Sequence, residues 1–290
     1  MSKRNLILTI LHGYDYPFVE PFFKSLKMVG YNGELVVFIS EKVSKATKTK
    51  IKAHGAKVVE YKAEYPFIES YRTAFGGISG SITINNYRFV LYQTYLEERL
   101  DEYAQVMLTD IRDVIFQRTP FSVPVTEGIS FFLEDPSHTF RHKLNYQWLT
   151  QATSKSLADK LLDKVVCCAG ITIGSTGEIL DYLQYIKGKL SQCEKLEWGL
   201  DQGIHNSYVY EIKPVTMRIF GSDEPYVINL GAYQPYSLNK DGELVNSLNQ
   251  PYAIVHQYDR SGGLFASIKE RYIGSRLMQK IKRIYYLIMP

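Results

Sequence analysis

Two aspartates three positions apart, Asp110 and Asp113, follow the apolar run Val106–Leu108 within five residues. Such a run is typical of a buried strand, and a buried carboxylate is costly unless it is paired or binds a cation. Carboxylate oxygens are the ligands that Mg²⁺ or Mn²⁺ prefers. Side chains alternate along an extended strand, so the two acids can share a cation only if the chain turns between them. The competing interpretation is that Asp110 pairs with Arg112 and Asp113 caps another element.

Two further stretches place polar side chains where chemistry is plausible. His256 ends the apolar segment "PYAIVH", where it is either a structural residue or a metal ligand. Asp201 and Gln202 open a short helix predicted from Leu200, and an acid at that point is favoured by the helix dipole. Gly170 interrupts the strand-like "VVCCAGITIG" and indicates either a close backbone approach or an ordinary bulge.

The elements that must position these residues alternate between strand and helix in the first half of the chain. Because strand and helix alternate, we expect a mostly parallel sheet flanked by helices, with ligands beyond the carboxyl ends of its strands. In chain order the predicted elements are a strand at 5–11, a helix at 17–28, a strand at 33–40, a helix at 41–55, a strand at 56–61, a helix at 83–100 and a strand ending at Thr109.

The second half is less regular. It is predicted to contain a strand at 128–135, one helical stretch at 149–164, a strand at 165–174, a helix at 175–192 with Ser175 as N-cap, and loops with short strands at 221–251. At 290 residues with 45% hydrophobic content, the chain is long enough for one large domain. We assign residues 1–262 to this domain, with halves at 1–120 and 121–262, and residues 263–290 to a carboxyl-terminal tail.

The tail holds most of the excess positive charge. Residues 269–283 contain six basic residues and one acidic residue, whereas the net charge of the whole chain is +4. At helical spacing, one side of the tail is apolar and the other basic, which suits an amphipathic helix on an anionic membrane surface or packed on the core. The remaining chain is near neutral and shows no recognition motif, so no nucleic acid partner is expected. The apolar stripe comprises Ile268, Tyr272, Leu277, Ile281 and Tyr285.

The cysteine pattern and the length of the apolar runs indicate the cellular compartment. Cys167, Cys168 and Cys193 are odd in number and lack a CxxC spacing, which favours neither a disulfide framework nor a zinc site. The adjacent pair is interpreted as small buried side chains. No signal-peptide core or run of about 18 apolar residues is apparent. The sequence therefore predicts a cytoplasmic protein, with the tail as a contact to the inner face of a membrane.

Four segments in a fixed order resemble the GT-A glycosyltransferases, which use nucleotide-sugar donors. They are "VIFQRTPF" after Asp113, "CCAGITIG", "WGLDQGIHN" and "VHQYDR", and the resemblance spans residues 5–260. It implies a GT-A (Rossmann-like) α/β fold in which a DxD-type motif binds Mn²⁺ or Mg²⁺. Asp110 and Asp113 occupy the matching place, although the spacing here is D-x-x-D. The resemblance implies that His256 is the third metal ligand. It implies that Asp110 either binds the metal or contacts the donor.

The same resemblance implies roles for other residues. Thr9, Leu11 and Tyr14 would lie near the nucleobase. Arg88 and Arg112 would contact the donor, Arg88 through its diphosphate, unless Arg88 is a solvent-facing arginine on its helix. Gly170 would form the floor under the donor sugar. Asp201 would hold sugar hydroxyls or act as the base of an inverting reaction, whereas Gln202 would lie near the anomeric carbon in a retaining one.

The function expected from the resemblance is transfer of a hexose-type sugar in polysaccharide biosynthesis. The donor would be a nucleotide-diphosphate sugar, UDP- or GDP-linked, and the acceptor a hydroxyl of a glycan or a lipid-linked glycan. The late histidine and the Asp-Gln pair favour retention of configuration. The alternative is a catalytically inactive GT-A-like protein that binds a glycan or a membrane. A nucleotidyltransferase is disfavoured because the turn after residues 5–11 has one glycine and no neighbouring basic residue.

Overall fold

A computed structural model describes residues 3–62, 83–122, 128–193, 196, 198–231 and 234–274. Across these residues the protein is a mixed α/β structure whose central sheet has seven strands in the order β3-β2-β1-β4-β7-β6-β8. The sheet is mostly parallel, as the alternation of strands and helices predicted; β2–β3 and β6–β8 are parallel pairs, and β6–β7 is antiparallel. The strands are β1 (Arg4–Leu11), β2 (Glu34–Ser40), β3 (Lys57–Tyr61), β4 (Tyr103–Thr109), β6 (Ile129–Phe132), β7 (Ile171–Ser175) and β8 (Met217–Phe220).

The helices of the first half are α1 (Tyr16–Met28), α2 (Lys45–Lys52) and α4 (Ile84–Glu97). Two of them, α1 and α4, begin and end within three residues of the predicted positions, whereas the helix predicted at 41–55 forms only at 45–52. Ser44 begins α2 by accepting a hydrogen bond from the backbone N–H of Thr47 at 3.3 Å. Later in the chain, Ser175 caps α7 (Thr176–Gln192) by accepting from the Glu178 N–H, which confirms the predicted N-cap.

The predicted helical stretch at 149–164 is wrong in one respect, because two helices occupy this region. They are α5 (Lys143–Ala152) and α6 (Lys155–Lys160). Between them, Thr153 leaves the helical conformation with φ −135° and ψ −110°, and its hydroxyl donates to the Leu149 carbonyl at 2.7 Å. Ser154 then accepts from the Leu157 N–H and starts α6. These hydroxyl groups compete for backbone partners and so separate the two helices.

The chain divides into two compact units, each built from three segments. The first comprises Met1–Leu6, Lys62–Leu108 and Val125–Phe220, and the second comprises Ile7–Tyr61, Thr109–Pro124 and Gly221–Pro290. The first unit contains α8 (Leu200–Ser207) packed on α5, followed by a π-helical turn at Tyr208–Ile212. Gly203 of α8 lies against the Trp148 backbone, where a Cβ atom would be 2.2 Å from the carbonyl oxygen, so only glycine allows this approach.

The second unit contains a small sheet of its own, in the order β5-β12-β9. β12 (Ile254–His256) is the middle strand; it pairs antiparallel with β5 (Val114–Phe116) and parallel with β9 (Val227–Asn229). A hairpin of β10 (Ser237–Leu238) and β11 (Leu244–Val245) belongs to the same unit, as do short 3₁₀ turns at Pro120–Ser122 and Tyr258–Arg260.

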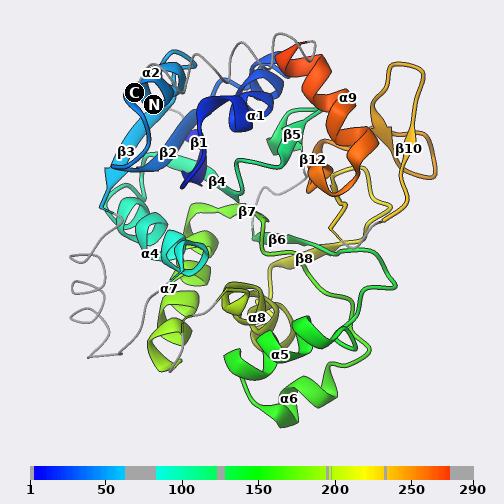
Figure 1. Cartoon of the computed structure of the whole chain (residues 1–290). Helices are drawn as coiled ribbons and strands as arrows, with labels where there is room; N and C mark the ends of the chain where they lie inside the picture. The colour runs from blue at the N-terminus through cyan, green and yellow to red at the C-terminus, as the bar shows by residue number, and fades with distance from the viewer. Residues whose placement is uncertain are drawn as a thin grey trace. The chain divides into compact units, whose positions relative to one another are not determined.

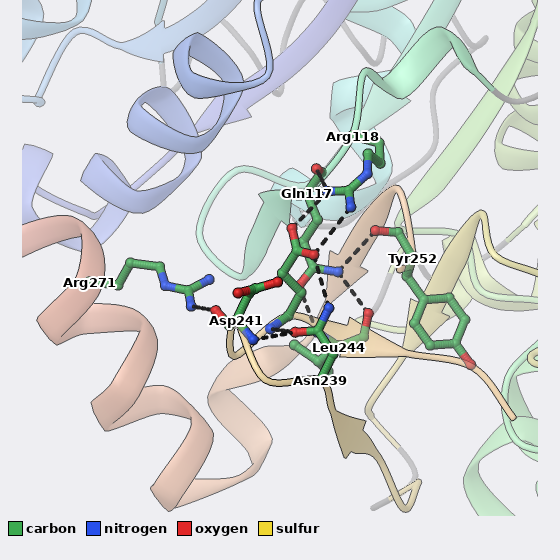
Figure 2. Close-up of polar contacts among 8 residues, drawn as sticks. Gln117, Arg118, Asn239, Asp241, Leu244, Tyr252 and Arg271 are labelled. Carbon is green, nitrogen blue, oxygen red and sulfur yellow. Dashed lines mark hydrogen bonds and ion pairs between the residues drawn. The ribbon is translucent and has the colours of Figure 1, made fainter. Parts of the chain in front are cut away.

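The hairpin is anchored to the end of β5 by one buried amide side chain. Figure 2 shows Gln117 bonded to both backbone groups of Leu244: its Oε1 accepts from the N–H at 2.8 Å and its Nε2 donates to the carbonyl at 2.9 Å. The same Nε2 donates to the Tyr252 carbonyl at 2.9 Å. Arg118 adds an ion pair to Glu243 at 2.7 Å, nearer to solvent. These contacts attach both the hairpin and the segment leading into β12 to the end of β5.

The first part of the predicted tail forms α9 (Gly262–Ile273), which packs against α1 (Figure 1). Leu264, Ile268 and Tyr272 are buried in the hydrophobic core of the second unit. Arg271 also donates to the Asp241 carbonyl at 2.7 Å, and this bond is drawn in Figure 2. For this part of the tail the apolar stripe therefore packs on the core, while Leu277, Ile281 and Tyr285 lie outside the residues that the structure describes.

Over the described ranges, no helix has both the length and the apolar character needed to cross a membrane.

Candidate metal centre

Asp110, Asp113 and His256 lie together in the second unit, with one ligand atom of each within 4.8 Å of the others. His256 Nε2 is 3.3 Å from Asp110 Oδ2 and 3.9 Å from Asp113 Oδ1. β4 ends at Thr109 and β5 begins at Val114, so the residues between them form a bend. The chain does turn between the two aspartates, which is the condition that a shared site requires.

The small sheet fixes where these side chains meet. In its register His256 is opposite Val114, the residue that follows Asp113. The Gln257 N–H also donates to the Asp113 carbonyl at 2.8 Å, and Gln257 has the left-handed conformation, with φ +61°. The end of β12 is thus tied by its backbone to the start of β5, and the histidine is held beside the second aspartate.

On its other side, the His256 ring contacts Asn229. The His256 Nδ1 lies 2.9 Å from the Asn229 Oδ1, and both residues are buried. Asn229 was not among the residues selected from the sequence. The short apolar run at 227–229 ends in an amide, but nothing in its spacing indicates that β9 pairs with β12 so that Asn229 and His256 are opposite each other.

The electrostatics of the centre favour a bound cation. Burial raises the pKa of the Asp113 carboxyl group, and the neighbouring Asp110 adds to this effect, whereas His256 opposes it. Two carboxylates this close in a buried site repel each other, and a positive charge between them would relieve the repulsion. Two carboxylates and an imidazole form an oxygen-oxygen-nitrogen donor set that suits a divalent metal such as Mn²⁺. The residues present therefore fit a divalent cation.

Ion pairs hold the Arg112 side chain next to this centre. Its Nη2 atom lies 2.6 Å from Asp259 and 3.7 Å from Asp113, and its guanidinium lies 5.4 Å from the centre of the Tyr14 ring. Burial acts to lower the pKa of Arg112, but the two carboxylates raise it overall, so the group stays charged. The Tyr258 hydroxyl donates to the Arg112 carbonyl at 3.0 Å. Asp259 and Tyr258, which support this loop, were not foreseen from the sequence.

The predicted nucleobase residues belong to the same unit but differ in exposure. Thr9 and Leu11 are fully buried in β1, whereas Tyr14 is 37% exposed. Contact of a ligand with the two buried side chains stays a prediction. The second unit also has a cavity of about 400 Å³, lined by segments that follow Asn229 and His256. Its lining residues are Leu230, Gln234, Pro235, Tyr236, Arg260 and Ser261.

The remaining predicted site residues lie in the first unit. Arg88 is buried, and its Nη2 is 3.0 Å from Asp201 Oδ2. The alternative that Arg88 faces solvent is therefore wrong; a side chain from the middle of α4 instead neutralises the acid at the start of α8. Asp201 does lie in the first turn of its helix, as the sequence indicated.

The side chains of Gln202 and Asn206 form hydrogen bonds with the backbone of the segment that precedes β7. Gln202 Oε1 accepts from the Ala169 N–H at 2.9 Å, and its Nε2 donates to the Cys167 carbonyl at 2.7 Å. Asn206, one helical turn later, bonds both backbone groups of Cys167 at 2.8 and 2.9 Å. These bonds set the path of the chain up to Gly170, just before β7 begins. The role of Asn206 was missed by sequence reasoning.

The three cysteines are thiols, and none of them is part of a disulfide. Cys167 and Cys168 are buried, as expected for small core side chains, and Cys193 is partly buried. Burial raises the pKa of the Cys167 thiol, which makes it a poor nucleophile.

The chain matches no family in a scan of protein-family models, and a search of curated proteins also finds no match.

Proposed function

We propose that this protein is a divalent-metal-dependent glycosyltransferase that uses a nucleotide-diphosphate sugar as its donor. The observation that carries the proposal is the group formed by Asp110, Asp113 and His256 beyond the carboxyl end of β4. Two carboxylates at 110 and 113 and a histidine at 256, brought together from distant parts of the sequence, suit a bound cation better than a structural ion pair.

Asp110, Asp113 and His256 would hold the metal, which is Mn²⁺ or Mg²⁺. When bound, such a cation supplies positive charge that stabilises the leaving diphosphate. Arg112 would contribute a second positive charge beside the same ligand. A guanidinium has five N–H donors, and its contacts with Asp113 and Asp259 use only part of them, so others can reach a phosphate.

Tyr14 would contribute to the nucleotide site together with Thr9 and Leu11. Its partly exposed ring already lies beside the Arg112 guanidinium, a position suited to stacking on a base or ribose. The donor would be UDP- or GDP-linked, as the resemblance implies.

Asp201 would bind hydroxyl groups of the donor sugar. The Arg88 guanidinium 3.0 Å away holds this carboxylate in one orientation, which suits an acceptor of hydrogen bonds from sugar hydroxyls. Because the Gln202 amide is engaged by the backbone at Cys167 and Ala169, its part in a retaining reaction would be to shape the floor at Gly170. Arg88 would act through Asp201.

The acceptor would be a hydroxyl of a glycan or of a lipid-linked glycan. Contact with an anionic membrane surface would come from the basic tail beyond Gly274, since Ile268 and Tyr272 are already buried in the core. The basic side chains of this segment would attract anionic lipid headgroups.

The test is a thermal-shift panel of UDP-, GDP-, CMP- and dTDP-linked sugars, with and without Mn²⁺. A ligand that binds the native state raises the melting temperature by mass action. We expect one nucleotide class to give a Mn²⁺-dependent shift that is lost in Asp113→Asn. The matched control is Asp163→Asn, which changes an exposed aspartate paired with Arg141 and should keep the shift.

Absence of a shift in the folded wild-type protein would contradict the proposed donor site. The protein would then be better described as a glycan-binding module, and a glycan array would test that alternative.

A further inference from the structure

The middle strand of the small sheet places His256 between two different sets of groups. On the β5 side, its Nε2 faces the carboxylates of Asp110 and Asp113 at 3.3 and 3.9 Å. On the β9 side, its Nδ1 faces the side-chain oxygen of Asn229 at 2.9 Å. The parallel register aligns His256 directly with Asn229, so this contact is built into the strand pairing.

An amide oxygen can only accept a hydrogen bond, so the proton of this contact must be on His256 Nδ1. In the neutral ring the other nitrogen, Nε2, then carries the lone pair, and it is Nε2 that faces the two carboxylates. Metal-binding histidines commonly donate their second N–H to a carbonyl or carboxylate, which fixes both the tautomer and the ring orientation.

We propose that Asn229 is a positioning residue for the metal centre: it holds His256 in the tautomer and orientation in which Nε2 binds the cation. This inference rests on the proposed metal site and adds a residue that does not touch the metal. Burial strengthens the effect, because Asn229 and His256 are 0% and 1% exposed and water has little access to replace the bond.

An amide has one advantage over a carboxylate at this position. The centre already contains two carboxylates, and Asp113 is buried. Asn229 orients the imidazole without adding a third negative charge to the group.

The experiment measures Mn²⁺ affinity by electron paramagnetic resonance, without any nucleotide, for the full chain and three variants. Asn229→Leu keeps the approximate volume but removes the acceptor, and we expect it to weaken Mn²⁺ binding 10- to 100-fold. Asn229→Asp restores an acceptor oxygen and should bind Mn²⁺ within about threefold of the wild type, or more tightly. Asn246→Leu is the control: this buried asparagine bonds Asp223 and Gln250 in the same unit, and its loss should leave Mn²⁺ affinity unchanged.

A second readout follows the tautomer itself. In ¹⁵N-histidine spectra of the metal-free wild-type protein, at a pH at which the ring is neutral, His256 should carry its proton on Nδ1; a His256→Gln sample assigns the signal. This measurement decides the proposal even if Asn229→Leu does not fold.

Two results would overturn the inference: a ring protonated at Nε2, or equal Mn²⁺ affinity in the wild type and Asn229→Leu. These two results differ from the result that would contradict the proposed function, which is the absence of nucleotide-sugar binding. If the protein binds Mn²⁺ as expected but no nucleotide sugar, the role of Asn229 stands and the donor proposal fails.

Discussion

The Arg88 guanidinium lies 3.0 Å from the Asp201 carboxylate, and this ion pair joins the middle of α4 to the first turn of α8. Only 9% of the Arg88 side chain and 8% of the Asp201 side chain are exposed. Each group neutralises a charge that burial would otherwise make very unfavourable. The pair therefore gives Asp201, a candidate site residue, a structural partner.

Replacing one partner of this pair should lower the free energy of unfolding strongly, whereas replacing both partners should lower it much less. We expect Arg88→Met or Asp201→Leu alone to lower the free energy of unfolding by about 3–5 kcal/mol, because each leaves a buried charge without its partner. The double variant should lose clearly less than the sum of the two. Urea denaturation followed by circular dichroism measures all three. Arg141→Met, which removes the exposed pair with Asp163, serves as the control and should cause no measurable change. Strictly additive losses would argue against a coupled pair.

Gln117 and Arg118 are adjacent residues that should differ strongly in their importance. Gln117→Leu leaves buried backbone groups of Leu244 and Tyr252 without their partner, so we expect a loss of about 2–4 kcal/mol in unfolding free energy. Arg118→Met removes an ion pair to Glu243 that is largely in solvent and should cost less than about 1 kcal/mol. Equal losses in equilibrium unfolding would show that Gln117 does not anchor the hairpin.

His205 should make the protein sensitive to acid. Its ring is fully buried, and burial together with the charge of Arg88 lowers its pKa to about 3. A lowered folded-state pKa means that its contribution to stability is present above about pH 6.5 and is lost as the pH falls toward 3. The total effect is on the order of 4–5 kcal/mol. His205→Gln keeps a polar group near the Tyr182 hydroxyl and cannot be protonated, so its stability should fall less steeply between pH 6.5 and 3.

Unfolding curves at several pH values test this expectation for His205. His142→Gln, at an exposed histidine, is the matched control and should follow the wild type. Parallel profiles for all three proteins would rule out His205 as the source of acid sensitivity.

Asp113→Asn should have opposite effects with and without metal. Burial raises the pKa of Asp113, so in the metal-free protein its contribution to stability is present below about pH 3.8 and is lost as the pH rises through the folded-state pKa. At pH 7 the metal-free variant should therefore melt at or above the wild-type temperature. With Mn²⁺ at 100 times its dissociation constant the wild type should gain about 2.7 kcal/mol, and the variant much less.

Differential scanning calorimetry with Mn²⁺ and with a chelator gives both comparisons. A variant that gains as much from Mn²⁺ as the wild type would remove Asp113 from the metal centre.

The sequence by itself determined the mixed α/β class of the fold and the approximate positions of most elements in the first half of the chain. Apolar strand runs, helical spacing and hydroxyl caps such as Ser175 act over a few neighbouring residues, and such local preferences can be read in order along the chain. The same reasoning selected Asp110 and Asp113, because carboxylates after a buried strand need a partner. It also selected His256 at the end of an apolar segment.

Only the tertiary structure decided which side chains meet. The pairing of Arg88 with Asp201 spans 113 positions, and the contact of Asn229 with His256 follows from a parallel register between two three-residue strands. The bonds from Gln202 and Asn206 to the backbone at Cys167 likewise depend on how a helix packs on a distant loop.

No local spacing records these contacts, since they are selected by burial and by the need of every buried polar group for a partner. The sequence therefore indicated Asp201 and the side chains of the proposed metal centre, whereas the folded chain supplied the partners that neutralise Asp201 and orient His256.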